Sequence, residues 1–542
     1  MTPRFEIVNN QYNIAYYCTR HQCLKGNAEK TAFRWIDHKG ERANYTFRQL
    51  DAESNKMANA LLQLGIKKDD VVFTFLPKMP EQFFAFLGIL KIQAIAGALF
   101  SNFGEEALAD RLGDCRAKIV ITKKSMLKKL LRALPLLDNL ETILVVDGDE
   151  NDEKIMSLPA LLEKSSDSFE IPLTSPDTPS VLHYTSGSTG KPKGVQHVHK
   201  SILTQSYTAI NVLTLNDEDV YWCTADQGWV TGISYGIIGP WSIGVTQVHY
   251  GGAYNAETWM KLLEEEGISK WYTAPTALRM LMREDKNMYK KFSLKKLQHI
   301  FSVGEPLNPE INAWAMDVWG KEVYDTWFQT ETGSIMICNR PAIKVKHATM
   351  GKPVDIINAA IISDDGKPCL TGETGNLCIK APWDSMFVDY LNNTGVYNEK
   401  IKNGYYYSGD LAFCDPEGYY HFVGRNDDVI NTAGHLISPF EVESSLLEIP
   451  EIAESAVIGA PDDILFEKVV AFIRLKNGIT WSDDLELKIR IFLSNRLSSI
   501  ATPQDIRIIE EIPKNKSGKI MRRVLKAWYK GEDPGDISTM EI

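Results

Sequence analysis

Residues 184–194 read YTSGSTGKPKG and overlap the end of a predicted strand, VLHYTS, at 181–186. The stretch contains three glycines, four serine or threonine hydroxyls and two lysines. Glycine lets consecutive backbone N–H groups turn toward one point, where they form an anion-binding nest. The hydroxyl groups add hydrogen-bond donors, and the lysines add positive charge. The stretch therefore predicts a loop that binds phosphate.

The spacing within this loop disfavours a P-loop NTPase. Two residues separate Gly187 from Gly190, and a proline follows the lysine. A Walker A loop needs four residues between its glycines, and Ser or Thr after the lysine. A flexible surface loop rich in glycine and serine is the alternative interpretation. Just after the loop, His197 and His199 are interpreted as the half-exposed start of a helix.

Upstream of the loop, short β-rich runs alternate with helical patterns. Strands are predicted at 71–77, 117–125 and 141–149, and a helix at 80–91. Alternation of this kind favours parallel sheets covered by helices. Lys91 interrupts the most apolar stretch, which runs from 83 to 100. We interpret that stretch as a buried helix leading into a core strand, and not as a membrane span.

Downstream, the pattern changes to short strands separated by turns. From Gly351 onward they are predicted at 356–369, 375–381 and 418–424, with Asp-Gly or Glu-Gly turns. A last segment has strands at 454–463 and 468–478 and a helix at 482–497. The predicted fold is therefore α/β. A large N-terminal domain, 1–426, would combine mixed sheets with a small β-rich unit, and a small mobile α+β domain, 427–542, would follow.

The composition is that of an average soluble protein, and it is acidic. Among 542 residues, 59 are Lys or Arg and 70 are Asp or Glu, so the formal net charge is −11. Such a chain has no overall attraction to nucleic acid or to anionic lipid. Its eight cysteines are too few for a disulfide framework and suit a reducing compartment. Without a signal-peptide pattern at the N-terminus, we expect a cytoplasmic protein with no nucleic-acid or membrane partner.

The phosphate loop resembles the signature of the acyl-adenylate-forming superfamily, and further segments match that family in order. These segments are Trp222–Asp226, Gly228–Gly232, Ala274–Thr276, Val303–Pro306, Thr326–Gly333, Tyr407–Asp410, Gly424–Asp428 and Pro513–Arg523. The resemblance covers essentially the whole chain. The runs WCTADQGWVTG and IMRRVLKAW are most similar to AMP-forming acetyl-CoA synthetases, particularly the shorter bacterial kind.

The resemblance implies a reaction in two halves. A carboxylate attacks the α-phosphate of ATP to give an acyl-adenylate and pyrophosphate, and coenzyme A then displaces AMP. The implied cofactors are ATP or AMP, Mg²⁺ and coenzyme A, and the implied substrate is a short carboxylate, with acetate preferred. Alternatives are a medium-chain or branched acyl substrate, an adenylation domain serving a carrier protein, and a nucleotide-binding sensor without catalysis.

Family resemblance also assigns roles to individual residues. Lys519 is the catalytic cation, Thr330 a donor to the α-phosphate, and Glu331 the Mg²⁺ ligand. Asp410 would accept the ribose hydroxyls, and residues 304–306 would lie against the adenine. The full nucleotide-binding set is Thr185, Ser186, Gly187, Ser188, Thr189, Gly190, Lys191, Gly304, Glu305, Pro306, Asp325, Thr326, Trp327, Gln329, Asp410 and Arg425.

The acyl pocket is predicted from the same resemblance. Acetate enzymes place tryptophan where this chain has Phe328, and relatives with longer substrates place glycine there. A bulky aromatic residue predicts a short pocket, but one methylene is worth only about 1–3 kcal/mol, so discrimination would be incomplete. The remaining walls would be Val230, Thr231 and Val303.

The resemblance also singles out three further residues. Asp427 matches the hinge of the mobile domain, and Gly434 would line the coenzyme A tunnel, where only a residue without Cβ leaves room. Leu436 stands where the family usually has an arginine that reaches the phosphate, so one cationic contact is missing. We therefore hypothesise that the enzyme also runs toward ATP and acetate. Acetylation of Lys519 by a lysine acetyltransferase, reversed by a deacetylase, would remove the charge that adenylation needs.

Overall fold

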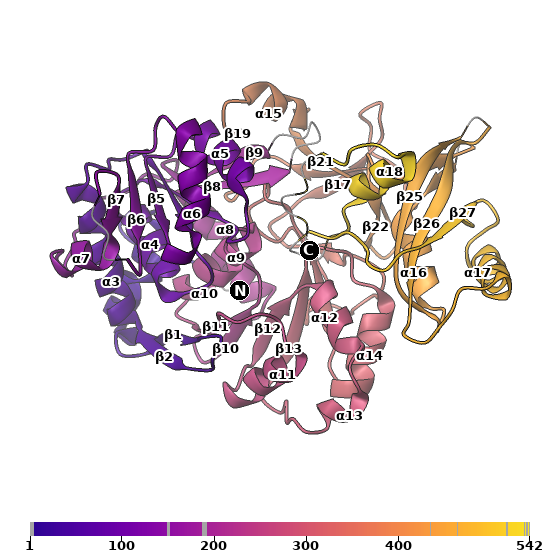
Figure 1. Cartoon of the computed structure of the whole chain (residues 1–542), viewed down its shortest axis with the longest axis horizontal. Coiled ribbons are helices and arrows are strands. Elements are labelled where there is room, and N and C mark those ends of the chain that lie inside the picture. Colours follow the sequence, from indigo (N-terminus) through magenta and orange to yellow (C-terminus); the bar gives the residue numbers. More distant parts are fainter. Residues whose placement is uncertain are drawn as a thin grey trace.

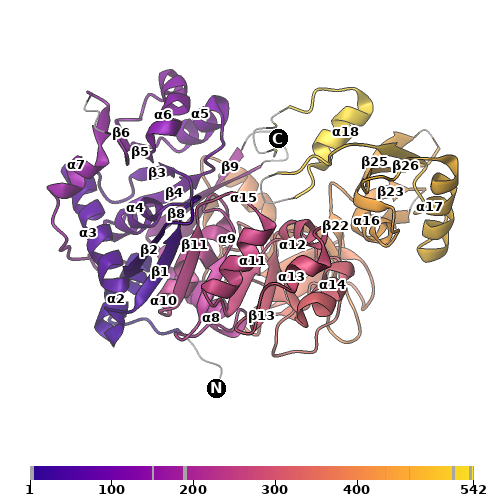
Figure 2. The same ribbon diagram turned by 60° about the horizontal axis from the view of Figure 1, so that its bottom comes forward.

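The computed structural model describes residues 5–148, 152–186, 192–433, 435–462, 464–515, 519–535, 537 and 540. Figure 1 shows a large N-terminal part, coloured indigo to pink, beside a smaller C-terminal part in orange and yellow. The two parts remain distinct in the turned view of Figure 2. Among the described residues the strands form four sheets. None of the helices in this part of the chain combines the length and apolar character that a membrane span requires.

The first sheet contains the strand that precedes the phosphate-loop motif. Its strand order is β19-β9-β8-β4-β3-β5-β6-β7, with β3 to β8 parallel and with β9 antiparallel to both β8 and β19. The strands are β3 (Val71–Phe75), β4 (Ile95–Leu99), β5 (Ile119–Thr122), β6 (Thr142–Val145), β7 (Ile155–Ser157), β8 (Pro179–Ser186), β9 (Pro192–Val198) and β19 (Asp389–Tyr390).

Helices of the N-terminal half accompany this sheet. They are α1 (Ile14–Cys18), α2 (Arg20–Gln22), α3 (Phe47–Gln63), α4 (Pro80–Lys91), α5 (Glu105–Asp114), α6 (Lys124–Ala133), α7 (Leu158–Glu163), α8 (Ile202–Asn211), α9 (Val230–Ile233) and α10 (Gly239–Ser242). The apolar stretch at 83–100 forms α4 and β4, as predicted. Lys91 is fully buried there because its ammonium donates to Asp51 Oδ1 and Asn55 Oδ1, each at 2.7 Å. An ion pair of this kind makes a buried charge tolerable.

The second sheet brings four of the motif segments to one edge. Its order is β16-β15-β14-β13-β12-β10-β11-β1-β2. Its strands are β1 (Thr31–Ile36), β2 (Arg42–Thr46), β10 (Val220–Cys223), β11 (Thr246–Tyr250), β12 (Lys270–Thr273), β13 (His299–Val303), β14 (Val323–Trp327), β15 (Ile337–Cys338) and β16 (Lys352–Pro353). Because β10, β12, β13 and β14 run parallel, the segments that follow them meet at their carboxyl ends. The helices α11 (Ala256–Glu265), α12 (Pro275–Met282), α13 (Lys286–Tyr289) and α14 (Pro309–Trp319) accompany this sheet.

The third sheet is the small β-rich unit that the turn pattern predicts. Strands β17, β18, β21 and β20 lie in that order, and β22 pairs with β21. The elements are β17 (Ala359–Ile362), β18 (Gly375–Lys380), α15 (Thr394–Lys400), β20 (Ile401–Lys402), β21 (Tyr405–Cys414) and β22 (Tyr420–Arg425). All pairings are antiparallel, and the β21–β22 register places Asp410 opposite Arg425.

The C-terminal part has its own sheet and core. β24, β23, β26 and β25 lie in that order, and β27 pairs with β26. The elements are β23 (Ile430–Thr432), β24 (His435–Ile437), α16 (Pro439–Leu447), β25 (Ile452–Asp462), β26 (Phe466–Leu475), α17 (Asp483–Arg496), β27 (Asp505–Ile508) and α18 (Arg522–Lys530). Val442 of α16, Val457 of β25 and Ile489 of α17 are fully buried together. The predicted α/β fold, with a large domain of mixed sheets and a small C-terminal domain, is confirmed.

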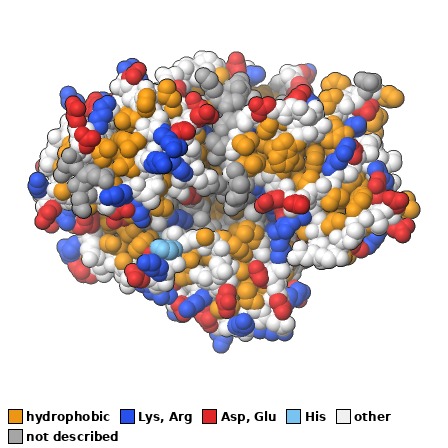
Figure 3. All heavy atoms as spheres, in the orientation of Figure 1, with side chains coloured by type: hydrophobic (Ala, Val, Ile, Leu, Met, Phe, Trp, Pro, Cys, Tyr) orange, Lys and Arg blue, Asp and Glu red, His pale blue; other side chains and the backbone are white. Residues whose placement is uncertain are grey.

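The surface carries charge of both signs. Figure 3 shows acidic and basic side chains interspersed with hydrophobic ones over the face seen in Figure 1. No large area of a single charge is visible among the described residues of this face. The distribution fits a chain whose acidic excess is spread over its length.

Candidate active site between the two domains

A cleft of about 1170 Å³ lies where the C-terminal domain meets the motif segments of the N-terminal domain. Both domains contribute side chains to its walls. The predicted site residues that line it are Thr185, Val230, Thr231, Val303, Gly304, Glu305, Pro306, Asp325, Thr326, Trp327, Phe328, Gln329, Thr330, Glu331, Asp410, Arg425, Asp427 and Lys519. Since residues from every part of the motif set converge there, this cleft is the candidate active site.

Part of the phosphate loop falls outside the described residues. The predictions concerned are those for Gly187, Ser188, Thr189, Gly190 and Lys191, and also that for Gly434 in the coenzyme A tunnel. The strands on both sides of the loop are described. β8 ends at Ser186 and β9 begins at Pro192, and these two residues pair across the hairpin. Thr185 lines the cleft, so the loop begins at the cleft wall.

The Asp410 carboxylate lies at the centre of a set of donors. Its Oδ2 accepts hydrogen bonds from Trp327 Nε1 at 2.9 Å and from Gln329 Nε2 at 3.0 Å. Its Oδ1 pairs with Arg425 Nη1 at 3.1 Å. Only 3% of Asp410 is exposed, and the Tyr406 hydroxyl donates to Gln329 Oε1 at 2.8 Å. The carboxylate is therefore held in one orientation at the cleft wall, where a directional acceptor for hydroxyl groups can act.

Asp325 lies in β14, buried next to the cleft. Burial raises the pKa of its carboxyl group to about 8, although the backbone N–H groups of Leu307 and Thr326 favour the charged form. The side chain is therefore protonated at neutral pH and can donate a hydrogen bond. A neutral donor at this wall suits contact with a ring nitrogen or carbonyl of a bound base.

Replacing Asp325 by asparagine should flatten the pH dependence of stability. Between pH 3.8 and about 8, the carboxyl group of Asp325 is protonated in the folded state and ionised in the unfolded state. The free energy of unfolding therefore falls as the pH rises through this window. Asparagine cannot titrate, so Asp325→Asn should lose less stability than wild type between about pH 5 and about pH 8. Urea unfolding at a series of pH values measures the free energy of unfolding of both proteins. If this free energy changed equally with pH in Asp325→Asn and in wild type, the prediction would be wrong.

The loop after β14 is held from two sides. The Tyr390 hydroxyl donates to Glu331 Oε1 at 2.8 Å, and burial raises the pKa of Tyr390, so the hydroxyl keeps its proton. His197 Nε2 donates to the carbonyl oxygen of Thr330 at 2.8 Å. The prediction of a half-exposed helix start at His197 and His199 is wrong about the exposure, since both residues are buried. His197 lies in β9, whereas His199 begins a short 3-10 turn, His199–Ser201, that leads into α8.

The turn after β13 carries the residues predicted to lie against adenine. Gly304 has φ +92°, and a Cβ placed on it would meet no atom within 4 Å, so it faces open space. A flat ring could approach the backbone there. The carboxylate of Glu305 accepts from Thr276 Oγ1 at 2.7 Å and forms an ion pair with Arg279. Sequence reasoning missed Arg279, which lies on α12 outside every matched segment.

The residues predicted for the acyl pocket line the cleft together. Val230, Thr231 and Val303 are buried. The ring of Phe328 meets the ring of Tyr235 edge to face, with centroids 5.5 Å apart and planes at 82°. Tyr235 is fully buried and its hydroxyl accepts a backbone N–H at 2.7 Å. Phe328 therefore rests on a fixed aromatic neighbour, which limits the room for an acyl chain.

Lys519 reaches the cleft from the C-terminal domain. Asn515 holds its backbone through two hydrogen bonds, since Asn515 N donates to Lys519 O at 2.9 Å and Lys519 N donates to Asn515 Oδ1 at 2.9 Å. Desolvation in the cleft lowers the pKa of Lys519, and the nearby Arg425 lowers it further, while Asp410 opposes the shift. The ammonium thus lies within electrostatic reach of the Asp410–Arg425 pair.

A cluster of ion pairs links the two domains near this segment. Glu454 of β25 pairs with Arg474 Nη1 at 2.8 Å, and also with Lys514 and with Arg283 of the N-terminal domain. Burial alone would raise the pKa of the Glu454 carboxyl group, but the three cations outweigh it and lower the pKa to about 2. Since Lys514 belongs to the same segment as Lys519, this cluster supports the position of Lys519.

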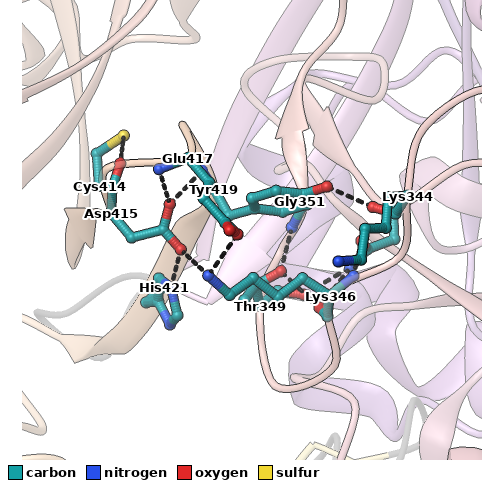
Figure 4. A network of polar contacts seen from close by, with 10 residues as sticks. Lys344, Lys346, Thr349, Gly351, Cys414, Asp415, Glu417, Tyr419 and His421 are labelled. Atoms are coloured by element: carbon teal, nitrogen blue, oxygen red, sulfur yellow. Dashed lines mark hydrogen bonds and ion pairs between the residues drawn. The ribbon is translucent and has the colours of Figure 1, made fainter.

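A second polar network supports the loop at 344–351, which contributes Ala348, Thr349 and Met350 to the cleft wall. Figure 4 shows that Asp415 Oδ2 bonds both Lys346 Nζ, at 2.6 Å, and His421 Nε2, at 2.9 Å. The Tyr419 hydroxyl donates to the carbonyl oxygen of Lys344. These contacts fasten the loop to the β21–β22 hairpin, the same hairpin that carries Asp410.

The predicted hinge and the departure from the family lie at the start of the C-terminal domain. Arg425 Nε is 3.7 Å from Asp427 Oδ1, and the Asp427 carbonyl oxygen accepts from Lys526 Nζ at 3.1 Å. Leu436, on β24, is 53% exposed. Among the described residues, Leu436 is not part of the cleft wall.

Comparisons with known proteins identify the family of the chain. The family model described as AMP-binding enzyme matches residues 20–391, and the model for the AMP-binding enzyme C-terminal domain matches residues 441–519. The chain is 44% identical over 532 residues to the acetyl-coenzyme A synthetase of Bacillus subtilis, covering 98% of this chain and 92% of that protein. It is 37% identical to the enzyme of the same name from Methanothrix thermoacetophila, covering 97% and 84%.

A solved structure has the same architecture. The anthranilate CoA ligase AuaEII in complex with anthranoyl-AMP superposes with a TM-score of 0.89 at 28% identity, covering 97% of this chain and 98% of that one. The match includes both domains. The resemblance expected from the sequence motifs is confirmed, and the chain belongs to the AMP-binding enzyme family, among relatives that are acetyl-coenzyme A synthetases.

Proposed function

We propose that the protein is an AMP-forming acetate–CoA ligase, which activates acetate with ATP and transfers the acetyl group to coenzyme A. The observation that carries this proposal is the convergence of Asp410, Thr330, Phe328 and Lys519 on one cleft. These residues would serve the ribose, the α-phosphate, the acyl group and the reacting carboxylate. The curated relatives named above support acetate as the acyl substrate.

In the first half-reaction, an acetate oxygen attacks the α-phosphorus of ATP and the bond to pyrophosphate breaks. Both reactants are anionic, so positive charge must screen them as they meet. Lys519 would supply that charge, and Thr330 would donate to an α-phosphate oxygen. The carboxylate is already a nucleophile, so no general base is required. Positioning and charge stabilisation then account for most of the rate enhancement.

Glu331 would hold the Mg²⁺ ion that accompanies ATP. Its Oε1 accepts from Tyr390, and its Oε2 has no hydrogen bond to the described residues. Mg²⁺ is usually held by one or two carboxylates together with substrate phosphates and water, which fits a single acidic side chain here. When bound, the ion neutralises phosphate charge. Tyr390 holds Oε1 of Glu331, so Oε2 would be the oxygen available to such an ion.

In the second half-reaction, the thiol sulfur of coenzyme A attacks the acetyl carbon and AMP leaves. We infer that the small domain, 427–542, rotates about Asp427 for this step, which would remove Lys519 and bring Gly434 to the thiol path. The contacts of Asp427 with Arg425 and Lys526 would have to rearrange. Because Lys519 lines the same cleft as Asp410, we infer that the present arrangement is the one that serves the first half-reaction.

The test of the proposed function is carboxylate-dependent formation of AMP with ATP, magnesium and coenzyme A, using acids from acetate to octanoate. A rate that peaks at acetate or propionate supports the proposal. A peak at longer or branched acids would keep the chemistry and refute the short pocket. Nucleotide binding without turnover of any acid would refute the function itself.

Enlarging the pocket at Phe328 should shift the chain-length preference. Phe328→Ala removes the ring that rests on Tyr235 and leaves space beside Val303. Because each methylene is worth about 1–3 kcal/mol, the ratio of kcat/KM for butyrate to that for acetate should rise about 10- to 100-fold. Phe413→Ala is the matched control, since Phe413 stacks on His421 and is not among the described cleft residues. An unchanged ratio in Phe328→Ala would place the acyl group elsewhere.

We further infer a cytoplasmic enzyme whose partners are small molecules. Leu436 stands in place of an arginine and cannot donate to a phosphate, and this missing cation is the ground for the hypothesis that the reaction also runs toward ATP and acetate. Assays of the purified protein in both directions decide this. If only the synthesis of acetyl-CoA were detected, the hypothesis would be wrong, while the proposed function would stand.

A further inference from the structure

Lys400 lies beside the ribose and phosphate residues, although no motif contains it. It ends α15, and β20 follows directly and pairs with β21 through Ile401–Tyr406 and Lys402–Tyr405. Because this pairing is antiparallel, Lys400 lies alongside the part of β21 that leads to Gly409. A Cβ placed on Gly409 would lie 3.2 Å from Lys400 Nζ and 3.4 Å from Arg425 Nη2. The two cationic groups therefore approach the same backbone position.

The ammonium of Lys400 faces the cleft without a protein counter-ion in direct contact. Lys400 lines the cleft and is partly buried. Among the described residues it forms no hydrogen bond and no ion pair within 4 Å. The nearest acids already have partners, since Asp410 bonds Arg425 and Glu331 bonds Tyr390. Its three N–H donors are thus available to something that enters the cleft.

The surroundings of Lys400 make an unpaired cation costly. Burial lowers the pKa of its ammonium, and the positive charge of Arg425 lowers it further, against the opposing effect of Glu331 and Asp410. A buried charge is stabilised when an opposite charge is supplied. Adding an anion beside Arg425 and Lys400 would satisfy both cations. The predicted ribose acceptor, Asp410, and the predicted Mg²⁺ ligand, Glu331, both lie within electrostatic reach of Lys400.

We propose that Lys400 is a further nucleotide-binding residue whose ammonium contacts an α-phosphate oxygen of ATP and of the acyl-adenylate, beside Arg425. The proposal rests on the proposed function, because it assumes a nucleotide with its ribose at Asp410. The proposed contact would also replace the cation that is missing at Leu436, whose side chain cannot donate to a phosphate. Lys400 would supply a cation from the N-terminal domain, so this contact does not depend on the position of the C-terminal domain.

Nucleotide binding by calorimetry tests the proposal with three ligands: adenosine, AMP and ATP. Lys400→Met keeps the length of the side chain but removes its charge. Hydrogen bonds to charged groups are strong, so the variant should bind AMP and ATP about 10- to 100-fold more weakly than wild type. Adenosine has no phosphate, so its affinity should not change. Lys400→Arg, which keeps the charge, should recover AMP affinity to within about fivefold of wild type.

Lys402→Met is the matched control, two residues further along the chain. Lys402 is exposed, lies over the ring of Tyr407, and is not among the described cleft residues. It should bind all three ligands like wild type. Three outcomes for Lys400→Met overturn the proposal: unchanged affinity for both AMP and ATP, an equal loss of affinity for adenosine, or weaker ATP binding with AMP binding unaffected. The last would place the contact on the outer phosphates.

The binding readout separates this proposal from the proposed function. Neither an acid nor coenzyme A is present, so acyl preference and thioester formation do not enter the measurement. If wild type bound AMP but turned over no carboxylate, the proposed function would fail. The affinities of Lys400→Met for AMP and adenosine would still decide the role of Lys400.

Discussion

Replacement of Lys519 by glutamine should abolish most adenylate formation while leaving thioester formation nearly intact. In the structure Lys519 lines the same cleft as Asp410 and Arg425, and its ammonium lies within electrostatic reach of both. Loss of a group that stabilises developing charge typically costs about 10²- to 10³-fold in rate. Acetate- and ATP-dependent pyrophosphate release should fall by at least this factor. The second half-reaction, started from prepared acetyl-adenylate and coenzyme A, should keep its rate within about threefold, since the proposed rotation moves Lys519 away.

Lys476→Gln is the control for Lys519→Gln. Lys476 is an exposed lysine of the same domain and is not among the described cleft residues, so both half-reactions should be unaffected. An equal loss in the two half-reactions of Lys519→Gln would contradict the assigned role and indicate a general structural defect. Enzymatic acetylation of Lys519 should have the same selective effect, because it also removes the charge. Full activity after complete acetylation would refute regulation by an acetyltransferase and a deacetylase.

The parallel strands and the motifs after them could be predicted from the sequence because both follow local rules. An apolar run that ends in Gly, Thr or Pro marks a buried strand and the turn at its carboxyl end. Parallel pairing of β12, β13 and β14 then brings these turns to one edge without further information. The convergence of Gly304, Thr330 and Thr326 on one cleft follows from that arrangement.

Contacts that join segments distant in sequence could not be predicted in this way. Lys400 reaches Gly409 because of the β20–β21 register, and Tyr390 reaches Glu331 from a short strand at the edge of another sheet. Neither residue belongs to a pattern with its own spacing signal. The misassignment of His197 has the same origin, because its burial depends on the Thr330 loop lying over it.

The position of the C-terminal domain is another property that the motifs do not specify. Glu454 forms ion pairs with Lys514, with Arg474 and with Arg283 of the N-terminal domain. Breaking a buried ion cluster on one side leaves charges without partners, which is costly. We expect the proposed rotation to begin only when bound ligands compensate for the loss of the Arg283 contact. The balance between the two half-reactions would then depend on this interface as well as on the cleft residues.

Replacement of Asp410 by asparagine should lower kcat/KM for ATP about as strongly as replacement of Lys519 lowers the rate of adenylate formation. The carboxylate accepts from Trp327, Gln329 and Arg425 and is almost fully buried. Asparagine keeps the shape but turns one acceptor into a donor, so at least one of these N–H groups faces another N–H group. Charged hydrogen bonds contribute about 1.5–3 kcal/mol each, so losing two should lower kcat/KM for ATP by about 10²- to 10⁴-fold.

Asp355→Asn is the matched control for Asp410→Asn, because Asp355 also pairs with an arginine, Arg340, at 2.7 Å but lies outside the described cleft wall. Its kcat/KM for ATP should stay within about twofold of wild type, because this ion pair is not part of the described cleft wall. If Asp410 is the ribose acceptor, Asp410→Asn should also discriminate less between ATP and 2′-deoxy-ATP than wild type does. Equal discrimination in the two proteins would mean that Asp410 only orients Arg425 and Trp327, and that the ribose hydroxyls are bound by another group.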